Sequence, residues 1–146
     1  MLLDLHADGQ PKENVRILDM GCGTGLTGQA LVQKGFARVH GLDASPGMLK
    51  LAEGRGYEKV EQLYLGEPDS FPEELKDQFE YVTATAILAE GHCGPKVFQE
   101  MNMALKQGGH TLFTTREQYM DELGYRQAIK ELVDEGKWKL VKEANF

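Results

Sequence analysis

Cysteine and tryptophan are scarce in this sequence, and acidic residues outnumber basic ones. The 146 residues contain two cysteines and one tryptophan, and the excess of acidic side chains gives a formal net charge of −7. Cys22 and Cys93 lie in different motifs with no second Cys or His at metal-ligand spacing, so we expect free thiols and no metal site. The acidic balance and the scattered basic residues argue against nucleic acid as a partner.

Long apolar runs are also missing. No stretch approaches the roughly 18 consecutive apolar residues of a membrane-spanning helix, and the N-terminal segment MLLDLHADGQ lacks the basic-then-apolar order of a signal peptide. We therefore expect a soluble, cytoplasmic protein with no membrane partner. A hydrophobic content of 41% is enough to fill one core, so residues 1–146 are expected to form a single domain.

Strand-like and helix-like segments alternate from residue 15 onward, and this alternation predicts an α/β fold with a parallel sheet covered by helices. Strands are expected at 15–20, 37–42, 60–65, 79–84 and 110–115, and a sixth strand is expected to start at 138–141. Helices are expected at 26–34, from Pro46, from Pro95 to the Gly108-Gly109 pair, and from Tyr125 to Gly136, with one helical turn near 73–76. Ser45 is predicted to cap the second helix, because serine is a preferred N-cap and proline suits the first helical position.

Three glycines at alternate positions, Gly21, Gly23 and Gly25, lie between the first predicted strand and the first predicted helix. Glycine permits the unusual backbone angles of a tight turn, and its missing Cβ lets a ligand touch the main chain. The second strand ends at Asp43, about 20 residues beyond the middle glycine, where a carboxylate can accept hydrogen bonds from both hydroxyls of a ribose. A carboxylate that ends a buried strand also needs a partner. The sequence therefore predicts a site for an adenosine-type ligand at the carboxyl edge of the sheet.

The glycines fit two kinds of adenosine ligand. Residues 23–28, GTGLTG, satisfy the dinucleotide fingerprint G-x-G-x-x-G. However, Asp19 lies two residues before the first glycine, and a carboxylate there would repel a pyrophosphate. The same carboxylate can face the cationic aminoacyl and sulfonium end of S-adenosylmethionine. The sequence favours this methyl donor, and a dinucleotide or a turn that binds nothing stays open as an alternative.

Two longer motifs carry a family resemblance. ILDMGCGTG followed by GLDASPGMLKLA resembles the first two motifs of class I S-adenosylmethionine-dependent methyltransferases, and FEYVTATAIL and LKQGGHTLFTTR continue the likeness through strands four and five. Thr114-Thr115-Arg116, the Glu90-Gly91-His92 loop and ELVDEGKW look like the Williams–Beuren-region methyltransferase-like family. The resemblance implies a Rossmann-like, doubly wound, mostly parallel sheet, S-adenosylmethionine as the cofactor, and methyl transfer to an unidentified small molecule or protein.

The resemblance also implies a set of cofactor-binding residues. Asp19 and the glycine turn would contact the methionine part, Asp43 the ribose, and Ala44 and Met48 the adenine. Glu67 stands near the position of an aspartate that often takes the adenine amino group in this family. The full expected set is Asp19, Gly21, Cys22, Gly23, Gly25, Asp43, Ala44, Met48, Glu67, Ala84, Thr85 and Leu88. Met48 and Leu88 are equally explained as ordinary apolar core positions.

No general base is obvious in the sequence. Methyl transfer from a sulfonium is an in-line displacement of an activated donor, so the protein mainly aligns the reactants and excludes water. A base is needed only when the acceptor loses a proton, and His92, with Glu90 beside it, is the candidate. Substrate contact and an ordinary loop histidine remain alternatives for His92. The alternative for the whole chain is a regulatory domain that binds the cofactor without catalysis.

Class I methyltransferases usually have seven strands and a helical N-terminal segment that covers the donor. Here about 14 residues precede the first predicted strand, and the sequence ends within or just after the sixth. We therefore expect the N-terminal helical cover and the seventh strand to be lacking, either in a chain truncated at both ends or in a minimal variant that recruits a partner. An open strand edge would favour self-association.

Overall fold

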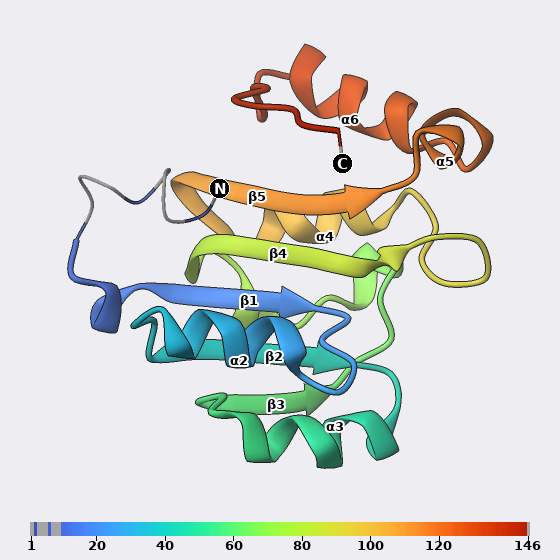
Figure 1. Cartoon of the computed structure of the whole chain (residues 1–146). Coiled ribbons are helices and arrows are strands. Elements are labelled where there is room, and N and C mark those ends of the chain that lie inside the picture. The colour runs from blue at the N-terminus through green and yellow to red at the C-terminus, as the bar shows by residue number, and fades with distance from the viewer. Residues whose placement is uncertain (1, 3–5, 7–9, 146) are drawn as a thin grey trace.

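The computed structural model describes residues 2, 6 and 10–145, which form a five-stranded sheet flanked by helices (Figure 1). The strands are β1 (Arg16–Met20), β2 (Arg38–Asp43), β3 (Lys59–Gln62), β4 (Phe79–Leu88) and β5 (Leu105–Thr115). Their order is β3-β2-β1-β4-β5, and every neighbouring pair is parallel. The strand order changes direction next to β1, and open α/β sheets bind ligands beside such a point. The predicted parallel α/β fold is confirmed.

Helices cover both faces of the sheet, as a doubly wound fold requires. α2 (Leu26–Gln33) and α3 (Pro46–Ala52) lie on one face, α4 (Val97–Ala104) lies on the other, and α5 (Glu117–Glu122) and α6 (Tyr125–Asp134) lie beyond β5 (Figure 1). Short 3-10 turns are η1 (Lys12–Asn14), η2 (Glu53–Arg55), η3 (Pro68–Ser70) and η4 (Glu73–Leu75). The last of these is the helical turn predicted near 73–76. None of the described helices is long and apolar enough to cross a membrane.

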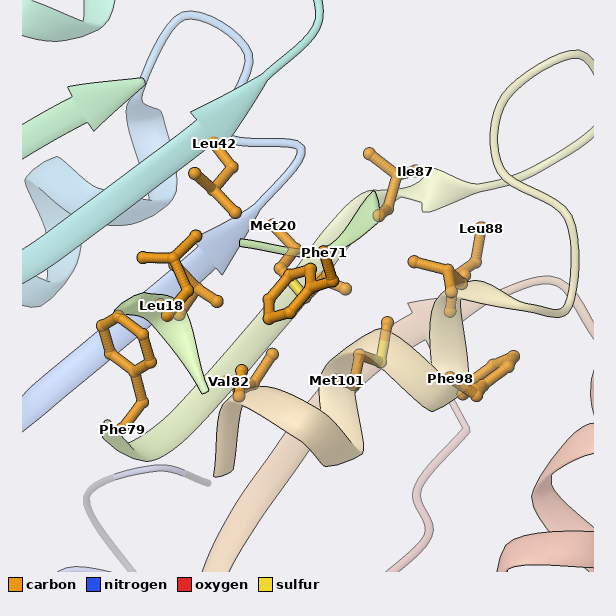
Figure 2. Close-up of a cluster of buried hydrophobic side chains, with 14 of the residues drawn as sticks. Leu18, Met20, Leu42, Phe71, Phe79, Val82, Ile87, Leu88, Phe98 and Met101 are labelled. Carbon is orange, nitrogen blue, oxygen red and sulfur yellow. The ribbon is translucent and has the colours of Figure 1, made fainter. Parts of the chain in front are cut away.

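Alternate side chains of β1 enter two different hydrophobic cores. Leu18 and Met20 turn toward α4 and join Met101 in the larger core (Figure 2). Ile17 belongs to the second core, which packs against α2. Because successive side chains of a strand point to opposite faces, Asp19 lies on the α2 face with Ile17. Asp19 can therefore influence a bound ligand only from the α2 face of the sheet.

The glycine pair Gly108-Gly109 does not end a helix, and that prediction is wrong. α4 ends at Ala104, and both glycines lie within β5. The register between β4 and β5 shifts across this stretch, and a Cβ on Gly109 would come within 2.9 Å of the Glu80 carbonyl oxygen. The glycines therefore accommodate a bulge where two strands come close.

The end of β4 also differs from the prediction. The strand continues past Ala84 to Leu88, and two side chains of β5 hold the extension. The hydroxyls of Thr114 and Thr115 donate to the carbonyl oxygens of Thr85 and Leu88, each at 2.7 Å. β3 is shorter than predicted, because the chain leaves the sheet after Gln62 and turns toward η3.

The predicted sixth strand does not form. Residues 138–145 are neither helix nor strand, and Trp138 packs its ring against Phe98 of α4 while its Nε1–H donates to Asn102 at 3.0 Å. The start of this stretch therefore packs against α4 rather than forming a strand. The expected lack of an N-terminal helical cover concerns residues 1–14, of which 1, 3–5 and 7–9 lie outside the described residues.

Candidate functional site

The carboxyl ends of the parallel strands meet at one edge of the sheet, on the right in Figure 1. The glycine turn follows β1 at this edge, Asp43 ends β2, and the loop that contains His92 follows β4. The motifs singled out in the sequence therefore come together where this class of fold binds its ligands.

In the glycine turn, protein atoms fill the space beside Gly21, whereas the space beside Gly23 is empty. Gly21 has a φ of +69°, and a Cβ on it would overlap the side chain of Ile87. Gly23 has a φ of +55°, and nothing lies within 4 Å of the position its Cβ would take. Cys22 is buried, and its N–H donates to the carbonyl oxygen of Leu42 at 2.9 Å. A ligand can therefore approach the main chain at Gly23.

Both carboxylate oxygens of Asp43 accept hydrogen bonds from backbone amides. The N–H of Gly23 donates to Oδ2 at 2.8 Å, and the N–H of Ser45 donates to Oδ1 at 2.9 Å. Ser45 is the predicted cap of α3, and its hydroxyl accepts from the N–H of Met48 at 3.3 Å. Each carboxylate oxygen has two lone pairs, so each can accept one more hydrogen bond. The half-buried Asp43 is thus fixed in place with two acceptor positions left for a ligand.

Asp19 lies beneath the glycine turn with 1% of its surface exposed. Its Oδ2 accepts from the hydroxyl of Tyr57 at 2.6 Å, and its Oδ1 accepts from the hydroxyl of Thr83 at 2.9 Å. Burial raises the pKa of Asp19 to about 6; the two hydroxyls lower this pKa, and the charge of Asp43 raises it. Because its side chain is covered by protein atoms, Asp19 can influence a ligand through its charge rather than by direct contact.

The ring of Tyr57 explains why the last position of the G-x-G-x-x-G fingerprint, residue 28, is a glycine. A Cβ on Gly28 would overlap the ring of Tyr57, and a Cβ on Gly41 would come within 2.8 Å of it. The Gly28 N–H also donates to the Tyr57 hydroxyl at 3.1 Å. Gly28 is therefore required for packing within this chain, and the fingerprint match does not by itself indicate a dinucleotide.

Glu67 lies on the loop after β3, and a second glutamate holds that loop. Glu67 is exposed, whereas Glu100 of α4 is 1% exposed and accepts from two consecutive amides, Gly66 N–H at 2.7 Å and Glu67 N–H at 3.1 Å. Burial raises the pKa of Glu100, while these two amides lower it. Since Pro68 has no N–H, residues 66–68 can offer a bound base only acceptors and the Glu67 side chain.

The predicted residues on β4 divide into buried and exposed positions. Ala84 and Leu88 are 0% and 2% exposed and belong to the α4-side core. Thr85 is exposed, and its hydroxyl lies 2.9 Å from the hydroxyl of Thr27 on α2. Thr85 therefore stands at the surface between the first turn of α2 and the end of β4, while Ala84 and Leu88 lie beneath it.

The remaining predicted residues lie at the surface of the same edge. Ala44 is half-buried and Met48 is 43% exposed, at the start of α3. His92 and Glu90 are both exposed in the loop after β4. The backbone N–H of His92 donates to the Ala89 carbonyl oxygen at 3.2 Å, which fixes the main chain of that turn.

Sequence reasoning did not find Tyr57 or Glu100. Gly28 inside a helix and Gly41 inside a buried strand were the available signals for Tyr57, since such glycines mark a close approach by another group. Glu100 lies on the apolar face of α4 between Val97 and Met101, and a carboxylate at such a position needs a buried donor.

Comparison with known proteins shows to which family the chain belongs. Residues 17–109 match the family described as methyltransferase domain. Human Methyltransferase-like protein 27 is 35% identical over 126 residues, which cover 85% of this chain and 49% of the relative. The ubiquinone biosynthesis O-methyltransferase of Paracidovorax citrulli is 31% identical over 114 residues, covering 72% and 45%. The crystal structure of an S-adenosylmethionine-dependent methyltransferase from Mesorhizobium loti aligns with a TM-score of 0.54 at 27% identity, covering 75% of this chain and 50% of the other.

The fold and the site define a methyltransferase domain of the Rossmann-like class. The chain belongs to the S-adenosylmethionine-dependent methyltransferases, so the resemblance seen in the sequence motifs to class I is confirmed. The cofactor of this family is S-adenosylmethionine. The chain spans about half the length of the relatives that it matches.

Proposed function

We propose that residues 1–146 act as one domain that binds S-adenosylmethionine at the carboxyl edge of the sheet and transfers its methyl group to a small molecule or a protein. The observation that carries this proposal is the carboxylate of Asp43, which Gly23 and Ser45 fix while two acceptor positions stay available. A ribose presents two adjacent hydroxyl donors, and a carboxylate held in this way matches them.

The other residues of the site take roles that follow from where they lie. In the proposal, the methionine part of the donor crosses the glycine turn at Gly23, where the main chain is open. The adenine lies between Met48 and the loop of Glu67, and Thr85 borders the methionine end. Asp19 attracts the cationic end from below the turn. The side chains of Ala84, Leu88 and Ala44 and the remaining residues of the turn, Gly21, Cys22 and Gly25, form the walls behind these contacts.

Asp43→Ala should weaken the binding of S-adenosylmethionine and S-adenosylhomocysteine, as measured by calorimetry. Two charge-assisted hydrogen bonds are lost, each worth roughly 1.5 to 3 kcal/mol, so affinity should fall roughly a hundredfold or more. Asp43→Asn keeps one acceptor and should lie between wild type and Asp43→Ala. The exposed Glu122→Ala in α5 is the control and should bind like wild type.

Asp43→Ala also leaves two backbone amides without their acceptor, so circular dichroism must show that the variant is folded. Wild-type affinity in a folded Asp43→Ala would remove the ribose assignment. A folded wild-type protein that gives no saturable heat with either ligand would remove the proposed function as a whole.

Catalysis in this proposal depends on alignment, with His92 as the candidate base only for an acceptor that must lose a proton. The exposed position of His92 in the loop after β4 supports this role and equally supports substrate contact.

Radiolabelled methyl transfer into cell extract separates an enzyme from a regulatory domain that binds the cofactor alone. Labelled acceptor that disappears with Asp43→Ala supports the enzyme, and donor binding without any labelled acceptor supports the regulatory domain. A nicotinamide-dinucleotide protein would instead enhance the fluorescence of the reduced dinucleotide, and we expect no enhancement.

We also propose that the outer edge of β5 pairs with a second copy of the chain. β5 spans Leu105–Thr115 and, among the described strands, has β4 as its single neighbour. A long unpaired strand edge exposes backbone donors and acceptors that readily pair with another chain. Light scattering should show a dimer whose fraction rises with concentration, and a monomer at every concentration would contradict this pairing.

A cytoplasmic location is part of the same proposal. Cys22 and Cys93 are both free thiols, and thiols stay reduced in that compartment. Cell fractionation with detection of the native protein tests it, and recovery with a secreted or organellar fraction would contradict it.

A further inference from the structure

The ring of Tyr57, which follows η2, fills a space that three glycines leave. A Cβ on Gly25 would come within 3.0 Å of the ring, one on Gly41 would come within 2.8 Å, and one on Gly28 would overlap it. These glycines belong to the end of the glycine turn, to β2 and to α2. The sequence therefore has glycine at each position where the backbone must make room for this one side chain.

The hydroxyl of Tyr57 joins the two elements that the glycine turn connects. It donates to Asp19 Oδ2 at the end of β1 at 2.6 Å, and it accepts from the N–H of Gly28 at 3.1 Å. Gly28 lies in the first turn of α2, where backbone N–H groups have no acceptor within the helix. Thr83 of β4 donates to the other oxygen of Asp19 at 2.9 Å. Asp19 is thus held from both sides by neutral hydroxyls.

The groups that face Asp19 leave its charge uncompensated. They are Tyr57 from the turn before β3, Thr83 from β4, Cys22 from the glycine turn and Asp43 from β2. Burial raises the pKa of Cys22 to about 12 and raises that of Tyr57 further above its ordinary value, so both stay neutral near pH 7. Among the described residues no Lys or Arg forms an ion pair with Asp19. Burial also raises the pKa of Asp19 to about 6, and the hydrogen bonds from Tyr57 and Thr83 oppose this rise.

We propose that Tyr57 is a positioning residue of the donor site, which holds Asp19 below the glycine turn and makes the affinity for the cationic donor depend on pH. The inference rests on the proposed donor site. S-adenosylmethionine carries a sulfonium charge that S-adenosylhomocysteine lacks, so an ionised Asp19 favours the first ligand over the second. As the pH falls through the pKa of Asp19, the carboxylate takes up a proton and this preference declines.

The first part of the test uses the ligand-free protein. Tyr57→Phe keeps the ring in its glycine-lined space but removes the hydroxyl that lowers the pKa of Asp19. The carboxyl carbon of Asp19, followed by NMR, should titrate near pH 6 in wild type and at a higher pH in Tyr57→Phe. Thr83→Val removes the other hydroxyl and should shift the titration in the same direction. Tyr81→Phe is the matched control, because Tyr81 is also buried and its hydroxyl bonds to His6 at 3.1 Å.

The second part measures the affinities for S-adenosylmethionine and S-adenosylhomocysteine between pH 5 and pH 8. In wild type the ratio of the two affinities should fall as the pH drops through about 6, by at most about tenfold per pH unit for one proton. Tyr57→Phe should move this fall to a higher pH, and Tyr81→Phe should leave it in place.

Two results would overturn the inference. One is an Asp19 titration that is the same in wild type, Tyr57→Phe and Thr83→Val. The other is a loss of affinity in Tyr57→Phe that is equal at every pH and equal for both ligands, because that would show a purely structural role. If neither ligand binds wild type at any pH, the proposed function fails instead, and the titration in the ligand-free protein still decides whether Tyr57 controls Asp19.

Discussion

Three carboxylates near the carboxyl edge of the sheet differ in how they are held, and this difference divides their roles. Asp43 is half-buried, is fixed by two amides and keeps two acceptor positions. Asp19 is covered and is bonded only to hydroxyls. Glu100 is covered as well, but both of its oxygens hold the backbone of the loop after β3. In the proposed donor site, a ligand can therefore meet Asp43 directly, whereas Asp19 is available only through its charge and Glu100 holds the shape of the loop.

Replacing Glu100 by Gln should loosen the loop after β3. The amide group keeps one acceptor oxygen but turns its own donors toward one of the two backbone N–H groups, which then lacks a partner. An unsatisfied buried donor costs about 1 to 3 kcal/mol, so urea should unfold Glu100→Gln at a lower concentration than wild type. Hydrogen exchange at Gly66 and Glu67 should also become faster. The exposed Glu122→Gln in α5 should change neither property. Unchanged unfolding and unchanged exchange in Glu100→Gln would show that the two hydrogen bonds do not hold the loop.

At the scale of elements, the parts of the site that follow local rules were predictable. The glycine turn after a buried strand and the Ser45-Pro46 start of α3 each depend on residues that are adjacent in sequence, and both form as expected. Contacts between distant residues were not predictable. Tyr57 reaches Asp19 across 38 positions, and the extension of β4 depends on hydroxyls from β5 that lie 29 and 27 positions away. The contact of Trp138 with Asn102 of α4, 36 positions away in the sequence, was not predictable either.

Ser45→Ala should lower the stability of the protein by weakening the start of α3. Ser45→Ala removes the hydroxyl that accepts from the N–H of Met48, and loss of a serine N-cap costs about 1 kcal/mol. The N–H of residue 45 still donates to Asp43, so donor affinity should change far less than in Asp43→Ala. Chemical denaturation and calorimetry measure the two quantities, with Ser70→Ala as the control at an exposed serine in η3. Equal stability of Ser45→Ala and wild type would show that the cap does not contribute.

Over the whole molecule, the charge near the amino ends of the strands differs from the charge near their carboxyl ends. At the amino ends, here called the amino edge of the sheet, a cavity of about 230 Å³ is lined by Arg16, Arg38 and Lys59. Two of these cations are paired, Arg38 with Glu58 at 3.3 Å and Lys59 with Glu61 at 2.9 Å. The amino edge is therefore a region of ion pairs on the surface of a protein whose formal net charge is −7.

The carboxyl edge carries carboxylates of a different kind. Among the described residues, neither Asp19 nor Asp43 forms an ion pair with Lys or Arg, and both lie beside a turn whose main chain is open at Gly23. Unpaired negative charge next to an open turn suits a donor with a cationic sulfonium and ammonium. The charge distribution therefore supports the proposal that the donor binds at the carboxyl edge.

The most direct test of the account is to locate the donor on the molecule by titrating S-adenosylmethionine into ¹⁵N-labelled protein and following each backbone amide by NMR. We expect the amide signals of Gly23 and Ser45 to shift in a saturable way, because both amides bond to the carboxylate that is proposed to meet the ribose. The amides of Arg38 and Lys59, at the opposite edge, should stay where they are. Saturable shifts confined to the amino edge, or no shifts in a folded protein, would contradict the central claim.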